Sequence, residues 1–450
     1  MRKHIMKVRY LRALTVGAVM VIGAGLLAGA TALAAEKAET KQPSAKLQKP
    51  LHDAQEDLKA KKYADAISKL KAAEGMDGKT PYDQHIINDF LAFAYIKTTN
   101  YADAAKAIEA EIDDGFTPQA EIPQKVKELT EINYQIKNYD KAIEFGNRAI
   151  KGGFADEQIR TIVGQSYYLK GDWKGTLKFE EAAVENQVKA GETPKKQTLE
   201  LILSACVKIN DSACETRALE RMVTYYPQPD YWYQLLYGMR QQTTGNDADT
   251  LQTYRLMSEV DVLKSADDYS EMAQLAIEAG SPGEAQHALE KGFAKNVFTE
   301  QRQKERNQRL LDNAKKQAAT DQASLAKVAQ EAEAAKTGQK DVGVGIAYLG
   351  YGQYDKAAEF LSKGVAKGGL KDEGQAELLL GIAQLKAGHK DEALKAFKAV
   401  KGDAALERLA NLWSLHAKEG SGASVSQTQK VKGAKKGSQS QRVARARAND

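Results

Sequence analysis

The segment Tyr63-Ala64-Asp65-Ala66 returns twice, as Tyr101-Ala102-Asp103-Ala104 and Tyr139-Asp140-Lys141-Ala142. The copies begin at residues 63, 101 and 139, so successive copies start 38 residues apart. A related segment, Tyr354-Asp355-Lys356-Ala357, lies far downstream. Self-similarity at a period of roughly 20–50 residues is typical of repeat architectures, in which each repeat is one supersecondary unit. The sequence therefore predicts an array of repeats.

A second motif precedes most of these segments and places a small residue before an aromatic one. Its copies are Leu91-Ala92-x-x-Tyr95, Val163-Gly164-x-x-Tyr167, Val344-Gly345-x-x-Tyr348 and Leu380-Gly381-x-x-Gln384. We interpret the two motifs as a helix pair, in which the small residue lets one helix approach the next closely. Large residues one turn into the second helix should fill the remaining space: Leu70, Ile108, Leu361 and Phe397. One pair cannot bury its apolar face alone, so the pairs must stack.

These motifs resemble the tetratricopeptide repeat (TPR) family. The resemblance covers clear repeats near 84–116, 122–153, 156–190, 338–370 and 373–402, and weaker ones near 47–76, 198–227 and 266–297. It implies an all-α fold, a TPR-like α-solenoid of stacked helix hairpins. The 38-residue spacing exceeds the usual 34 of the family, which predicts longer loops or helix ends.

The N-terminus is typical of a targeting segment. Residues 1–12 are basic, residues 13–33 are apolar, and Ala32-Leu33-Ala34 matches the small-x-small pattern that signal peptidase recognises. We therefore expect a signal peptide over 1–34, cleavage between Ala34 and Ala35, and a periplasmic or exported protein. An uncleaved membrane anchor is the alternative, because about 20 apolar residues can span a bilayer.

Composition divides the rest of the chain. We expect a flexible linker over 35–46, an N-terminal TPR-like solenoid over 47–298 and a long charged helix or helical hairpin over 299–337. C-terminal repeats with a capping helix should follow over 338–417, so that the charged segment separates two arms. Residues 418–450 are rich in Gly, Ser, Gln, Lys and Arg, which predicts a disordered basic tail.

Charge is distributed unevenly along the chain. The net charge is +5 in total, of which 1–35 carry +5 and 418–450 carry +6, which leaves −6 on 36–417. A mildly acidic body argues against nucleic acid as a partner. The basic tail is suited to contact anionic envelope surfaces.

No cluster of residues suited to catalysis or metal binding is evident. The chain has 6 His, and no two of them have the spacing of a zinc hydrolase helix. The glycines around Gly345 lie in helical sequence, without the preceding strand that a dinucleotide-binding loop needs. We therefore predict a protein that is not an enzyme and binds no cofactor and no metal.

The 2 cysteines, Cys206 and Cys214, lie eight residues apart across an expected turn between helices. Antiparallel helices would bring them together, so a disulfide is one interpretation for an exported protein. Two buried thiols are the other.

The resemblance to TPR proteins implies a groove that binds peptides or partner helices. Carried over onto this sequence, the groove positions are Phe93, Ile96, Lys97, Lys127, Glu131, Tyr134, Gln165, Tyr168, Ile346, Leu349 and Ile382. The alternative is that part of this set packs against neighbouring helices. The paired Lys and Asn with which some TPR domains clamp a C-terminal carboxylate are absent from these positions.

We therefore expect an exported scaffold that binds protein or peptide partners of a cell-envelope complex. The chain also resembles exported bacterial TPR proteins described as components of TonB systems, including at Tyr225-Tyr226-Pro227-Gln228-Pro229-Asp230-Tyr231-Trp232. An accessory protein of cell-wall or polysaccharide-export machinery is the alternative.

Overall fold

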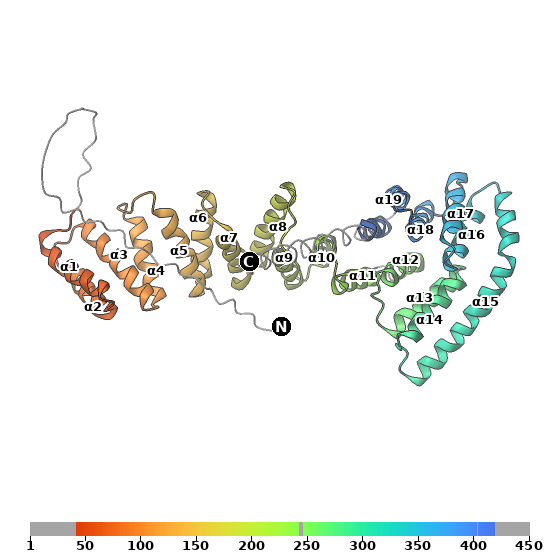
Figure 1. Ribbon diagram of the computed structural model, residues 1–450, viewed down its shortest axis with the longest axis horizontal. Coiled ribbons are helices and arrows are strands. Elements are labelled where there is room, and N and C mark those ends of the chain that lie inside the picture. Colours follow the sequence, from red (N-terminus) through yellow and green to blue (C-terminus); the bar gives the residue numbers. More distant parts are fainter. Residues whose placement is uncertain (1–41, 243–245, 403, 419–450) are drawn as a thin grey trace, which may run out of the picture. The chain divides into compact units, whose positions relative to one another are not determined.

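The computed structural model describes residues 42–242, 246–402 and 404–418, and all regular elements in these ranges are helices (Figure 1). The predicted signal peptide (1–34) and the predicted basic tail, apart from Lys418, lie outside the described residues. Helix α1 begins at Ala45, so the end of the predicted linker is helical.

The chain divides into two compact units, whose boundary in the sequence lies between Thr99 and Asn100. In the first unit the structure describes α1 (Ala45–Lys59), α2 (Tyr63–Glu74) and α3 (Pro81–Lys97). Helix α3 starts at a capping box, in which the Asp83 amide donates to Thr80 Oγ1 (3.1 Å) and the Thr80 amide donates to Asp83 Oδ2 (2.8 Å). The other Asp83 oxygen accepts from the Ser44 amide at 2.8 Å, which ties the start of α1 to α3.

The second unit holds the remaining helices, most of them 12 to 17 residues long. They are α4 (Tyr101–Asp113), α5 (Ile122–Gln135), α6 (Tyr139–Lys151), α7 (Glu157–Lys170), α8 (Trp173–Lys189), α9 (Lys196–Lys208), α10 (Ser212–Tyr225), α11 (Pro229–Gln242), α12 (Asp247–Glu259), α13 (Ala266–Glu278), α14 (Pro282–Ala294), α15 (Gln301–Glu333), α16 (Gln339–Gly350), α17 (Tyr354–Lys367), α18 (Glu373–Lys386), α19 (Lys390–Ala399) and a helix over residues 404–418.

The helix pairs pack as the motifs predict. A Cβ placed on Gly345 of α16 would lie 2.6 Å from Leu361 Cγ of α17, and one on Gly381 of α18 would overlap the Phe397 ring of α19. The small residues thus admit the large residue of the second helix into the helix crossing. Leu361 and Phe397 are buried as a result.

Short turns join the two helices of each pair. Gly171, between α7 and α8, has φ = 85°, a left-handed conformation that glycine adopts without strain. Asp172 then caps α8 by accepting a hydrogen bond from the Gly175 amide at 2.8 Å. The chain therefore reverses direction within a few residues, because the left-handed Gly171 ends α7 and Asp172 starts α8.

The charged segment forms one helix of 33 residues, α15, where the sequence allowed one helix or a hairpin. Its buried residues recur along one stripe: Asn307, Leu311, Ala314, Ala318, Leu325 and Ala332. The sequence predicted that this segment separates two arms. Within the second unit, one hydrophobic cluster includes residues of α10–α15, α18, α19 and the 404–418 helix, among them Trp232, Leu311 and Trp413.

Candidate partner-binding face

The predicted groove residues fall into both units. In the first unit, Phe93 of α3 is half-buried and its ring lies 6.3 Å from that of Tyr63, nearly perpendicular to it. The Lys97 ammonium lies 5.1 Å from the Phe93 ring centre, as in a cation–π contact. Ile96 is buried. Phe93 and Lys97 therefore have accessible surface, whereas Ile96 packs in the core.

Three contacts join α5 to α7 in the second unit, and each involves a predicted residue of α5. Lys127 Nζ donates to Asp156 Oδ2 at 2.9 Å, Gln158 Nε2 donates to Glu131 Oε1 at 2.9 Å, and the Tyr134 hydroxyl donates to Gln165 Oε1 at 2.7 Å. Burial raises the pKa values of Glu131 and Tyr134. The side chains of this face are therefore ordered and partly withdrawn from water.

The same arrangement continues from α7 to α9 and α11. The hydroxyl groups of Tyr168 and Ser204 share a hydrogen bond of 2.6 Å, and the Tyr231 hydroxyl donates to Glu200 Oε1 at 3.1 Å. The Tyr168 ring also packs against Trp173, with 4.9 Å between ring centres. We name the surface formed by Lys127, Glu131, Tyr134, Gln165, Tyr168 and Ser204 the α5–α7–α9 face.

Three large apolar side chains on α7, α8 and α9 are exposed. Leu169 follows Tyr168 at the end of α7 and is 50% exposed, and Val207 lies one turn beyond Ser204 in α9 and is 48% exposed. Val188, near the end of α8, is also exposed. Leu169 lies four residues after Gln165, so helical spacing places both on one side of α7. Large exposed apolar side chains are typical of surfaces that bind other proteins.

The sequence did not identify Ser204, Glu200 or Tyr231 as members of this set. Helices α9 and α11 lack the small-x-x-aromatic motif by which positions were carried from one repeat to the next. The contacts themselves, such as Tyr168 with Ser204, 36 residues apart, appear only once the helices are packed.

The predicted groove residues of the C-terminal repeats pack inside the second unit. Ile382 is 2% exposed and belongs to the large hydrophobic cluster that includes Trp232 and Trp413. Leu349 packs against the same cluster, and Ile346 packs against a smaller one that includes Leu361. Ile382 is therefore core in this structure, as the alternative interpretation of the groove residues allowed.

Helix α12 explains part of this burial, because residues 249–257 are buried without interruption although several are polar. Arg255 makes two hydrogen bonds to Glu284 of α14, at 2.8 and 2.6 Å. Gln252 donates to Gln375 of α18 at 2.6 Å. At the end of α12, His416 and Lys386 hold the pKa of Glu259 at about 2. The C-terminal repeats thus pack on a helix of their own unit through paired polar groups.

Cys206 of α9 and Cys214 of α10 form a disulfide, with Cα atoms 5.4 Å apart. Both residues are buried in a cluster with Leu199, Ile202 and Met222. The bond links α9, the helix that carries Ser204, to α10, the second helix of the same pair.

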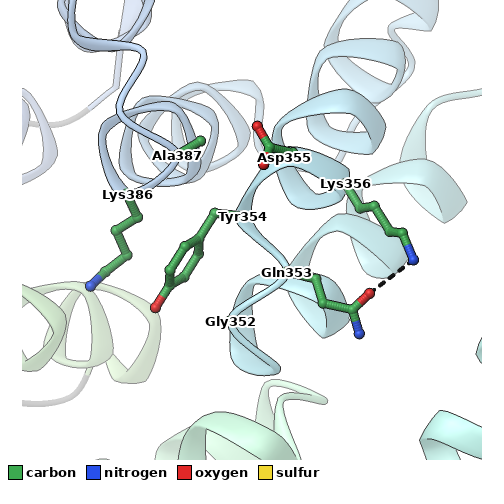
Figure 2. A pocket seen from close by; sticks show the side chains of 7 residues that line it. All are labelled: Gly352, Gln353, Tyr354, Asp355, Lys356, Lys386 and Ala387. Carbon is green, nitrogen blue, oxygen red and sulfur yellow. Dashed lines mark hydrogen bonds between the residues drawn. The ribbon is translucent and has the colours of Figure 1, made fainter.

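A surface pocket in the C-terminal repeats is lined by residues 352–356, Lys386 and Ala387. Figure 2 shows the Tyr354 ring beside Lys386, with Lys356 directed toward Gln353. Lys356 Nζ donates to Gln353 Oε1 at 3.0 Å, and Lys386 pairs with Glu259 at 2.5 Å. The two cations nearest the pocket are therefore engaged by neighbouring side chains.

In the part of the chain that the structure describes, no three His, Cys, Asp or Glu side chains converge as metal ligands. Within the same residues, no helix combines the length and apolar character needed to cross a bilayer.

No protein-family model matches the chain, and no curated protein does. Among solved structures, the chain aligns with the C-terminal part of a TPR repeat-containing protein from Cytophaga hutchinsonii, at 14% identity and a TM-score of 0.28, over 59% of this chain and 93% of that one. A tetratricopeptide repeat protein from Parabacteroides merdae aligns at 10% identity and a TM-score of 0.27, over 73% and 98%. A maize pentatricopeptide repeat protein aligns at 16% identity and a TM-score of 0.30, over 79% and 50%.

The chain's own helix packing decides the fold. Repeated helix pairs meet at a small residue, as at Gly345 with Leu361 and at Gly381 with Phe397. Within the described residues, the protein is an all-helical array of stacked helix pairs, a fold like that of tetratricopeptide repeats.

Proposed function

We propose that this protein is a non-catalytic scaffold that binds a protein or peptide partner over the α5–α7–α9 face. The observation that carries the proposal is the pair of hydrogen bonds from Tyr134 to Gln165 and from Tyr168 to Ser204. They hold two half-exposed aromatic rings in fixed orientations on α5 and α7, the first helices of successive pairs. Rigid, oriented aromatic side chains contribute strongly to protein interfaces because they lose little conformational entropy on binding.

The chemistry of the face indicates the kind of segment that it would bind. Its charged groups are largely matched, because Lys127 pairs with Asp156 and Lys196 lies 3.6 Å from Glu200. Leu169 and Val207 add apolar surface. A partner segment with apolar or aromatic side chains and few charges would therefore fit better than a strongly charged one.

The setting that we propose is the cell envelope. The N-terminal segment with Ala34 supports export, and the disulfide between Cys206 and Cys214 is compatible with an oxidising compartment. A role beside a TonB-type system, or alternatively in cell-wall or polysaccharide-export machinery, is part of this proposal. N-terminal sequencing of the native protein should start at Ala35, and intact Met1 in a membrane fraction would contradict cleavage.

Paired surface substitutions test the binding face. We would replace Leu169 and Val207 by Ser and quantify the partners that copurify with the tagged full chain from its native cells. Because both side chains are exposed, thermal stability should change little, while recovery of the specific partner should fall at least about tenfold. Val328→Ser on α15 is the matched control, since Val328 is also an exposed apolar residue. Equal recovery with all variants would contradict the proposed face.

A further inference from the structure

The repeat of α7 and α8 departs from the packing rule that the C-terminal repeats follow. In the C-terminal repeats, the residue 16 positions after the small residue is apolar: Leu361 follows Gly345, and Phe397 follows Gly381. In the repeat of α7 and α8 the small residue is Gly164, and the residue 16 positions later is Glu180. A carboxyl group therefore occupies the position of an apolar core side chain.

The structure places Glu180 deep between helices. Its residue surface is 5% exposed, and a Cβ placed on Gly164 would overlap Glu180 Oε1, so the carboxyl group lies directly on the α7 backbone. Burial raises the pKa of Glu180 to about 7, and a hydrogen bond from Thr198 of α9 offsets part of this effect. The carboxyl group thus contacts α7 and α9 from its position on α8.

Charged groups of the surrounding helices are engaged elsewhere or face water. Lys195 pairs with Glu157, Lys170 with Asp140, and Glu181 lies 4.0 Å from Arg221. Two tyrosines of α7 face α8: Tyr167 packs on Phe179, and Tyr168 packs on Trp173. Lys189 and Lys196 each lie near a carboxylate of their own helix. The remaining cations of α7, α8 and α9 are exposed: Arg160, Lys174, Lys178 and Lys208. Burial therefore governs the ionisation of Glu180.

The contact at Glu180 lies close to the proposed binding face. Gly164, against which the carboxyl group packs, is one helical turn before Tyr168 on α7. Thr198 lies on α9, the helix that also carries Ser204. The two helices that meet around Glu180 are therefore the same two that the Tyr168–Ser204 hydrogen bond joins.

We propose that Glu180 acts as a proton-controlled latch for the α5–α7–α9 face. When neutral, the carboxyl group fills the core position and holds α7, α8 and α9 together. When ionised, it needs water that the closed packing excludes, so α8 loosens from α7 and the Tyr168–Ser204 contact weakens. The inference rests on the proposed function, because it makes partner binding at this face tighter in acid than in mildly alkaline conditions.

Amide hydrogen exchange of the full chain tests the latch without any partner. Protection would be measured from pH 5.5 to 8.5, corrected for the intrinsic pH dependence of exchange, in peptides from α7, α8 and α9. Peptides from α13 and α14 serve as an internal reference. We expect protection in α7–α9 to fall at least about tenfold over this range. The opening equilibrium grows about tenfold with each pH step of one between the ordinary carboxyl pKa of 4.5, which the opened state has, and the raised pKa of about 7, and it levels off above that. The reference peptides should not follow this change.

Three variants complete the test. Glu180→Leu restores the side chain found in the C-terminal repeat, and Glu180→Gln keeps the shape without the charge, so both should remove the pH dependence. Glu185→Gln, on the exposed surface of α8, should behave like the wild type. The same fall in protection in both Glu180 variants, or no fall in the wild type, would overturn the latch. Either result leaves the proposed binding face standing, since that proposal is tested by partner recovery.

Discussion

Tyr168 on α7 and Ser204 on α9 share a hydrogen bond of 2.6 Å between their hydroxyl groups, although 36 residues separate them in the sequence. The bond lies on the α5–α7–α9 face, and the Tyr168 ring also packs against the Trp173 ring, with 4.9 Å between ring centres. It therefore fixes one aromatic ring relative to the next helix pair.

A double-mutant cycle measures this bond. Tyr168→Phe and Ser204→Ala should each lower the free energy of unfolding by about 1 kcal/mol, the usual net value of a hydrogen bond in a protein. Because the residues share one bond, the double variant should be less destabilised than the sum of the single variants. Urea unfolding provides the values, and additive effects would show that the two hydroxyl groups are not coupled.

Two glycines of α16 form a matched pair for testing the repeat packing. Gly345→Ala should lower stability by about 1–3 kcal/mol, since the added methyl group would meet Leu361. Gly343→Ala should raise stability by up to about 1 kcal/mol, because alanine favours the helix and the added Cβ would meet no atom of another residue's side chain or of a neighbouring helix within 4 Å. Thermal unfolding checks both. Equal effects of the two substitutions would contradict the close helix crossing.

Glu180 should make stability depend on pH. Its pKa is raised in the folded state to about 7 from the ordinary value of 4.5, so the folded state holds the proton more tightly. The stabilisation from this group is then complete below about pH 4.5 and is lost as pH rises through about 7. The loss amounts to at most about 3 kcal/mol of the free energy of unfolding. The difference in unfolding free energy between the wild type and Glu180→Gln, followed across this range, isolates the effect. A difference that stays constant with pH would show that Glu180 titrates normally.

The disulfide should stabilise the α9–α10 pair. Closing the short loop between Cys206 and Cys214 restricts the unfolded chain, which in the chain-entropy model is worth about 2–3 kcal/mol. Urea unfolding of the oxidised and the reduced wild type should differ by this amount. Alkylation of two free thiols in the unfolded protein isolated without reductant would contradict the bond.

The sequence predicted the helical repeats well because their signal is local. Small residues such as Gly345 and Gly381, and their apolar partners 16 positions later, follow from a pattern that recurs along the chain. The turn at Gly171 is likewise decided by a single residue that tolerates a left-handed backbone. Such features need no knowledge of distant contacts.

The environment of Ile382 could not be predicted from the repeats. Its burial depends on a core that also includes residues of α10–α15 and the 404–418 helix, more than a hundred positions away for α12. Helix α12 also has no repeat motif, and its buried Arg255 and Gln252 are polar residues that patterns assign to solvent. Their partners, Glu284 and Gln375, become evident only when the unit is assembled.

Site-specific photocrosslinking tests the central claim most directly. A photoreactive residue at Thr161, one turn before Gln165 on α7, leaves the Tyr134–Gln165 hydrogen bond intact and should crosslink in living cells to a specific protein that copurifies with the wild type. The same residue at Gln317, exposed on α15, should not. Adding Leu169→Ser and Val207→Ser should abolish the crosslink from position 161. A crosslink to that partner from position 317 alone, or an undiminished crosslink from 161 in the double variant, would contradict the α5–α7–α9 face as the binding site.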